Sequence, residues 1–138
     1  MIPAGFLLRG ECFEGHRGKP RHQSELIPRI ATGRCGGIAK TGGICGAVSG
    51  GVLAINMVTG RNKAGQSTES SVRLVRALFS EFEAEFGTTN CERIIGCRRD
   101  TAEGQRFFKG NKLREKKCQI FTQNAAGLAR VGQCQRLP

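Results

Sequence analysis

The sequence predicts an all-α protein: a small single-domain helical bundle with a glycine-rich loop before a buried central helix. Three observations predict this class. Apolar residues in the second half recur every three or four positions, the period of an α-helix that faces a core. An uncharged, glycine-studded run over 42–60 has the length of one buried helix. The 138 residues, 38% of them hydrophobic and 24% charged, have the size and composition of one globular domain.

The chain is predicted to divide into a basic, poorly ordered arm over 1–23 and a cysteine-rich helical domain over 24–138. The arm is rich in Arg, Lys and Gly and lacks periodic apolar residues, so it offers little to a core. His16 and His22 lie in it and are interpreted as solvated loop residues. The apolar stretch before Arg9 is too short for a signal peptide. We therefore expect a cytoplasmic protein with reduced thiols.

The first long helix is expected within Ile44 to Val58, as a buried core helix. Gly46, Gly50 and Ala54 repeat at a spacing of four, with Ala47 and Gly51 beside them, which leaves one helical face nearly bare for another helix to approach. A membrane span is not expected, because six glycines, Ser49 and Asn56 interrupt the run over 42–60.

The clearest amphipathic helix is predicted between about 68 and 86. Ser67 or Thr68 can cap its start, and Gly87 stands where a left-handed residue ends a helix. Charged residues occupy the face opposite the apolar one. The apolar face is predicted to contain Val72, Val75, Leu78, Phe79, Phe82 and Phe86.

Three shorter elements are expected after this helix. A helical turn follows Cys91 through Ile94 and Ile95. Asp100 and Glu103 resemble a capping box that opens a short helix through Phe107 and Phe108. The last helix is expected from about Leu113, and its core face is predicted to contain Cys118, Phe121, Ala125 and Leu128.

The glycine-rich stretch over 33–41 invites comparison with a phosphate-binding loop. A Walker A motif that ends at Lys40 and Thr41 needs glycine where this chain has Arg34 and Ala39. A tight turn is therefore the better interpretation. We expect its backbone to wrap around Cys45, at a helix N-terminus whose dipole favours a thiolate.

Seven cysteines in a short chain require a chemical explanation. They stand at 12, 35, 45, 91, 97, 118 and 134. None forms a CxxC pair, so a zinc ribbon, a thioredoxin-type site and covalent c-type haem are not expected. An odd number also disfavours a fully disulfide-paired scaffold.

Several motifs between Ile27 and Leu128 occur in the same order as in a known protein family. They are Ile30-Ala-Thr-Gly33, Thr41-Gly-Gly-Ile-Cys45-Gly-Ala-Val-Ser-Gly50, Phe82-Glu-Ala-Glu-Phe86-Gly-Thr-Thr-Asn-Cys91, Ile95-Gly96, Asp100-Thr-Ala-Glu-Gly104 and Lys117-Cys118. This stretch resembles the redox-active proteins named for a C-GCAxxG-C-C cysteine pattern. A similar module carries a non-haem iron centre in split-Soret cytochromes.

The resemblance implies that Cys45, Cys91 and Cys118 are the functional thiols. Members of the family usually begin with an apolar helix that carries a first cysteine, whereas this chain has a basic stretch around Cys12. Cys97, Cys12 and Cys35 are therefore the candidates for a fourth ligand.

Four thiolates suit an iron-sulfur cluster or a tetrahedral zinc, whereas two or three suit thiol/disulfide exchange without metal. We expect a cluster or other metal used for electron transfer, without turnover of a defined substrate. The alternative for any single cysteine is a small apolar core residue. That alternative carries most weight for Cys134 and substantial weight for Cys97.

A second class of function, binding of polyanions, follows from the net charge of +11 and the pI near 10.0. Residues 88–138 contain eleven Lys and Arg against four acidic residues. The chain has no Tyr or Trp to stack on bases, so nucleic acid is disfavoured. An acidic redox partner protein fits the charge better, and a homodimer is left open.

Overall fold

The structure is a computed structural model that describes residues 24–134, apart from the side chains of residue 28 and residues 131–134. The predictions for the arm, Cys12, His16 and His22 lie outside the described residues, as does the side chain of Cys134. Within the described range the all-α class is confirmed, with six α-helices and one π-helical turn. No helix in this range is long and apolar enough to cross a membrane.

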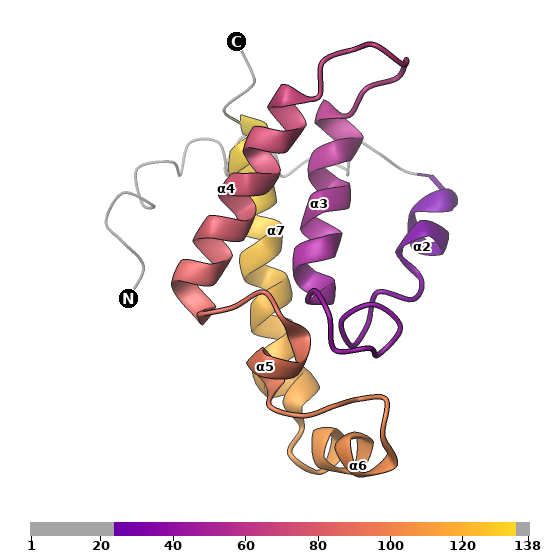
Figure 1. Ribbon diagram of the computed structural model, residues 1–138, viewed down its shortest axis with the longest axis vertical. Coiled ribbons are helices and arrows are strands. Elements are labelled where there is room, and N and C mark those ends of the chain that lie inside the picture. Colours follow the sequence, from indigo (N-terminus) through magenta and orange to yellow (C-terminus); the bar gives the residue numbers. More distant parts are fainter. Residues whose placement is uncertain (1–23, 135–138) are drawn as a thin grey trace.

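Three long helices form the bundle: α3 (Gly46–Thr59), α4 (Glu69–Phe86) and α7 (Gln119–Cys134). The helices α3 and α7 run in the same direction and α4 runs against them (Figure 1). The short helix α2 (Leu26–Ala31) stands beside α3, on the side away from α4.

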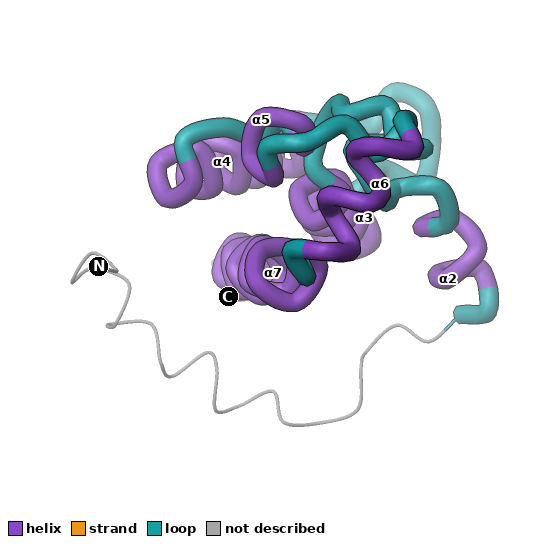
Figure 2. Tube along the Cα trace, turned by 90° about the horizontal axis from the view of Figure 1, so that it is seen from below, coloured by secondary structure: helices purple, strands orange, loops and turns teal. Residues whose placement is uncertain are grey.

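The remaining elements lie at the end of the bundle where α3 and α7 begin (Figure 1). They are the helices α5 (Cys91–Ile95) and α6 (Ala102–Gly110) and the π-helical turn η2 (Arg114–Cys118). Figure 2 looks along the long helices onto this end. The chain therefore places the starts of α3, α5 and α7 close together.

The central helix α3 approaches α4 and α7 closely at Gly51. A Cβ atom there would lie 2.8 Å from Leu78 Cδ2 and 3.6 Å from the Ala125 carbonyl oxygen. Close helix packing on the predicted small-residue face is therefore confirmed at Gly51 but does not extend to Gly50, where a Cβ would meet nothing within 4 Å.

The buried face of α3 consists of Val48, Gly51, Ile55 and Thr59. Burying the branched side chains of this face removes more apolar area from water than burying the small-residue stripe would. The predicted burial of the whole helix holds for this face only, since Met57 and Val58 are 40% and 43% exposed.

The helix α4 begins and ends within one residue of the predicted bounds, and Gly87 is left-handed at φ 83° as expected. Its predicted apolar face is confirmed except at Val72, since Leu78 and Phe82 are buried and Val75, Phe79 and Phe86 pack against the core. The buried residues are Ser71, Leu74, Leu78 and Phe82, whereas Val72 is 42% exposed. Phe82 and Phe86 meet Phe121 of α7 with ring centroids 6.0 and 4.9 Å apart.

The start of α6 is capped by Thr101 and not by the predicted Asp100. The Gly104 N–H donates to Thr101 Oγ1 at 3.1 Å, and the Asp100 carboxylate pairs with Arg98 instead. A Cβ on Gly104 would collide with the Arg98 carbonyl oxygen. The cap therefore moves one residue along the chain, because the carboxylate has a charged partner outside the helix.

Candidate functional site

The glycine-rich loop before α3 is a short left-handed turn. Gly36 and Gly37 have φ of 74° and 75°, and the next three residues continue at 62°, 50° and 64°. Those three are Ile38, Ala39 and Lys40. Left-handed backbone costs about 1–2 kcal/mol for each residue with a side chain, so the surrounding contacts must hold this turn. Gly42 and Gly43 donate their N–H groups back to Gly36 and Gly37 at 2.9 and 3.0 Å.

This turn packs directly against Cys91. A Cβ on Gly37 would lie 2.7 Å from Cys91 Cβ and 2.5 Å from the Gly43 nitrogen. A Cβ on Gly46, next to Cys45, would lie 2.8 Å from the Arg34 carbonyl oxygen. The loop therefore contacts the start of α3, near the predicted position at Cys45, and it also contacts Cys91, which the sequence did not predict.

An antiparallel bridge between Ile44 and Asn90 ties the loop to the start of α5. The Cys45 N–H donates to the Thr89 carbonyl at 2.8 Å, and the Cys91 N–H donates to the Gly43 carbonyl at 2.6 Å. Side chains alternate along extended backbone, so both thiols leave the bridge on the face opposite Ile44. Accordingly, Ile44 is 43% exposed, whereas Cys45 and Cys91 are 6% and 5% exposed.

Cys118 closes the π-helical turn η2 and leads into α7. It is half-buried and packs against the core, so the predicted core-facing position is confirmed. Isolated π-turns in helices occur frequently at functional sites. Here the turn brings the third candidate thiol to the bundle end that holds Cys45 and Cys91.

Electrostatic effects link the thiols at this end of the bundle. Burial, and then the thiols of Cys45 and Cys118, raise the pKa of Cys91 from an ordinary 9.0 to about 12. Burial and then Cys45 likewise raise the pKa of Cys118. Cys97 contributes to the shift at Cys91, and Cys35 to that at Cys118. The structure therefore brings together the three predicted thiols and two of the candidate fourth ligands.

These five cysteines, 35, 45, 91, 97 and 118, are called the cysteine cluster below, and all five are free thiols. As they stand, no three Cys, His, Asp or Glu side chains of the described chain form a ready-made metal site. The donor set nevertheless has the chemistry of one, since thiolates from separate elements are the usual ligands of iron-sulfur clusters and zinc.

Arg99 is the residue of this site that sequence reasoning missed. It lowers the pKa of Cys91, Cys97 and Cys118, against the larger raising effect of burial. Its guanidinium carbon lies 4.1 Å from the centroid of the Phe108 ring, an arrangement that stabilises a cation. The available signal was its position two residues after Cys97 in a basic stretch.

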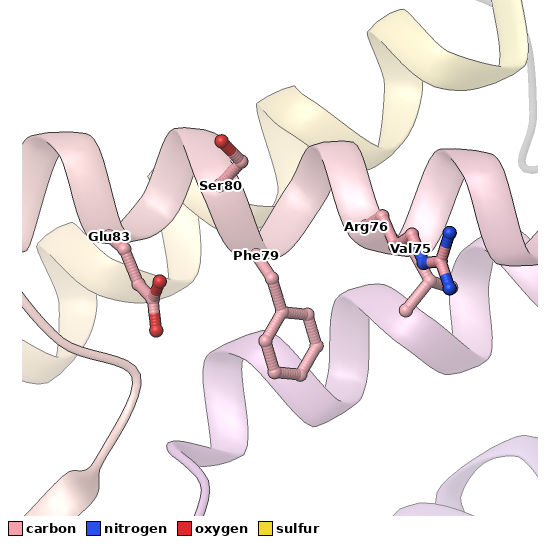
Figure 3. Close-up of a pocket in the computed structure, with 5 residues that line it drawn as sticks. All are labelled: Val75, Arg76, Phe79, Ser80 and Glu83. Atoms are coloured by element: carbon pink, nitrogen blue, oxygen red, sulfur yellow. The ribbon is translucent and has the colours of Figure 1, made fainter.

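A pocket of about 450 Å³ on α4 is separate from this chemistry. Its lining consists of Val75, Arg76, Phe79, Ser80 and Glu83. Figure 3 shows Phe79 and Glu83 on the side of α4 that faces α3, with Ser80 on the other side. It contains no thiol, so the cysteine cluster is the candidate site.

Comparison with known proteins identifies a family match over the part of the chain that contains the cysteine cluster. No curated protein and no solved structure matches it. A family model with the description "Putative redox-active protein (C_GCAxxG_C_C)" matches residues 15–131, most of the chain and the whole cysteine cluster. The chain therefore belongs to the C_GCAxxG_C_C family of redox-active proteins.

Proposed function

We propose that this redox-active protein transfers electrons through a metal centre, most simply an iron-sulfur cluster, held by Cys45, Cys91 and Cys118. The observation that carries the proposal is the gathering of these thiols from the starts of α3, α5 and α7. Two of them are buried and the third is half-buried. When bound, such a cluster supplies reversible one-electron transfer.

The electrostatics favour a metal over plain thiol/disulfide exchange. Exchange requires a thiolate, and with a pKa of about 12 the Cys91 thiol stays protonated near neutral pH. A coordinating thiol, in contrast, gives up its proton to the metal charge. Burial and then the repulsion between neighbouring thiolates raise the pKa of Cys91 and Cys118, and the metal charge would offset that repulsion.

Cys97 is the best supported fourth ligand. It is half-buried, packs against the core and interacts with Cys91. Cys35 is exposed, which makes it a weaker candidate for a site enclosed by the core. Cys12 lies outside the described residues. Only experiment can decide whether it is the fourth ligand.

Metal binding is expected to order this end of the bundle. Within 24–134 the ligand side chains are not in a metal-binding arrangement. Rotation of those side chains would therefore accompany binding, and binding free energy would add to folding free energy. A metal-loaded protein should resist thermal unfolding better than the same protein without metal.

The test is anaerobic purification followed by iron and sulfide analysis, absorption spectroscopy and a redox titration. Cys45→Ser, Cys91→Ser and Cys118→Ser should each abolish the iron-dependent spectrum. Among Cys97→Ser, Cys35→Ser and Cys12→Ser, only the variant of the true fourth ligand should do the same. Cys134→Ser is the matched control and should keep the spectrum.

Two results would overturn the proposal. Stoichiometric zinc in place of iron would remove electron transfer, because zinc has no redox chemistry in proteins. A metal-free protein with a reversible dithiol titration, lost in Cys45→Ser and Cys118→Ser, would establish the alternative of a thiol/disulfide redox protein.

The surplus of positive charge also bears on the redox partner. A net charge of +11 accelerates encounters with acidic proteins through long-range attraction. An acidic electron donor or acceptor is therefore the partner we propose. Association rates that do not fall with added salt would contradict it.

A further inference from the structure

A second pocket, of about 430 Å³, lies between α6 and η2. It is lined by Arg99, Phe108, Lys109, Lys112, Arg114 and Glu115. Four of these side chains are cationic and one is anionic, so the pocket has a surplus of positive charge. Its volume falls in the range of small-molecule sites, about 300–1,000 Å³.

The cations of this pocket form no salt bridge with any described residue. Along the described chain the only ion pair joins Arg98 to Asp100, so Glu115 does not form a salt bridge with any of the four. The Arg99 Nε atom is buried and has no hydrogen-bond partner among the described residues. A buried donor of this kind is costly unless some acceptor reaches it.

The backbone around the pocket is also shaped in an unusual way. Lys112 is left-handed, with φ of 51°, a conformation that costs about 1–2 kcal/mol for a residue with a side chain. It stands between α6 and η2, and both elements contribute to the lining. Strained residues of this kind gather at binding sites more than elsewhere.

From these observations we propose that the pocket binds a compact small molecule with at least two phosphate or carboxylate groups. Four cations that form no salt bridge with the described residues, gathered around one concave site, match several anionic groups better than a single one. Phe108 is 7% exposed and already covered by Arg99, so no ring surface is free to stack on an aromatic ligand. The ligand is therefore expected to be compact and non-aromatic.

This site is separate from the proposed metal centre but adjoins it. Arg99 both lines the pocket and acts on the thiols of Cys91, Cys97 and Cys118. The anion proposal does not depend on whether the cysteine cluster holds a metal. The test therefore measures binding of the anion directly.

The experiment is calorimetric titration of the full-length protein, as purified, with pyrophosphate, citrate and acetate at one ionic strength. Pyrophosphate and citrate distinguish a phosphate ligand from a carboxylate ligand, and acetate tests single charges. The expected result is saturable 1:1 binding of pyrophosphate or citrate with no detectable binding of acetate. Metal analysis before and after the titration excludes chelation as the source of heat.

A matched pair of triple variants locates the site. Lys109→Gln/Lys112→Gln/Arg114→Gln removes three pocket charges, and Arg73→Gln/Arg106→Gln/Lys116→Gln removes three exposed charges outside the lining. The pocket triple should weaken binding at least about tenfold, which corresponds to about 1.4 kcal/mol. The control triple should stay within about twofold of the unmodified protein.

Arg99→Lys provides a second, independent reading. It keeps the charge but removes the planar fork that meets two oxygens at once, so binding should weaken although net charge is unchanged. Equal weakening by both triple variants would show a diffuse surface field of the kind that attracts nucleic acid, and would overturn the proposal. Absence of saturable binding by both pyrophosphate and citrate would overturn it as well.

Discussion

Cys45 and Cys91 stand one residue beyond the paired residues of the same antiparallel bridge, Ile44 and Asn90. Each thiol also marks the start of a helix, with Cys45 at the cap of α3 and Cys91 as the first residue of α5. Backbone hydrogen bonds of 2.8 and 2.6 Å hold the two segments together. The spacing of these two cysteines is therefore fixed by backbone.

Gly37 should be the residue of the glycine-rich loop least tolerant of a side chain. In Gly37→Ala the new methyl group would meet Cys91 Cβ and the Gly43 nitrogen, at a φ of 75°. The loop must shift to relieve both contacts. We expect a loss of more than about 2 kcal/mol of stability, together with faster labelling of Cys91 by a thiol reagent.

Gly33→Ala is the control for this loop. Its φ of 88° imposes the same backbone strain, but a Cβ there would meet nothing within 4 Å. It should cost only about 1 kcal/mol and leave Cys91 protected. Equal labelling rates in the two variants would show that the contact between loop and cysteine is unimportant.

The pKa of Cys91 predicts a loss of stability at alkaline pH in the reduced, metal-free protein. Burial and the neighbouring thiols raise the pKa from 9.0 to about 12, so the folded state keeps a proton that the unfolded state releases above pH 9. Stability should be unaffected by this group below pH 9 and should fall as pH rises from 9 towards 12. The maximal loss is on the order of 4 kcal/mol.

Denaturant unfolding at pH 8, 9 and 10 measures this dependence, with Cys91→Ala as the control. The difference in free energy of unfolding between the unmodified protein and Cys91→Ala should shrink as pH rises. Because the chain contains no Tyr, thiolate absorption can be followed without interference from tyrosinate. A Cys91 thiolate already formed at pH 8 would contradict the prediction.

Gly104 should be required for the first turn of α6. It is buried beside the Arg98 carbonyl oxygen, and its N–H is the donor to the Thr101 cap. Gly104→Ala should therefore destabilise the protein by about 2 kcal/mol or more. Gly110→Ala, where a Cβ would meet nothing within 4 Å, should be neutral or slightly stabilising. Melting temperatures of the two variants provide the comparison.

The elements of this fold were predictable where the signal is local. The bounds of α4 followed from helical periodicity and from Gly87 as a left-handed end. Its buried face was less predictable, because two neighbouring apolar stripes share the helix. Leu78, which packs against Gly51 of α3, was on the predicted face, whereas Leu74 was not. The burial of Leu74 in place of Val72 depends on tertiary contacts.

The candidate site shows the same division. Periodicity placed Cys118 on a core-facing position, and the family pattern singled out Cys45 and Cys91. Neither could reveal the bridge between Ile44 and Asn90, which joins segments more than forty residues apart. Arg99 was missed because its effect on the thiols depends on how the chain folds back over Phe108.

Variants of Cys118 give the clearest test of whether a cysteine of the cluster is a metal ligand or only a core residue. If it binds metal, Cys118→Ser should remove the metal and the linked redox transition, because a hydroxyl is a poor substitute for a thiolate. Cys118→Ala should do the same. The reason is that both changes leave Cys45 and Cys91 without their third partner.

If Cys118 is only a core residue, both variants should keep the spectrum, and Cys118→Ala should cost only about 1 kcal/mol for a small, half-buried group. Metal content, reagent-accessible thiols and melting temperature of the two variants decide between these outcomes. Cys134→Ala, at the far end of α7, is the control for loss of a cysteine as such. Full retention of iron and of the redox transition in Cys118→Ser would remove Cys118 from the site, because the end of η2 would then contribute packing alone.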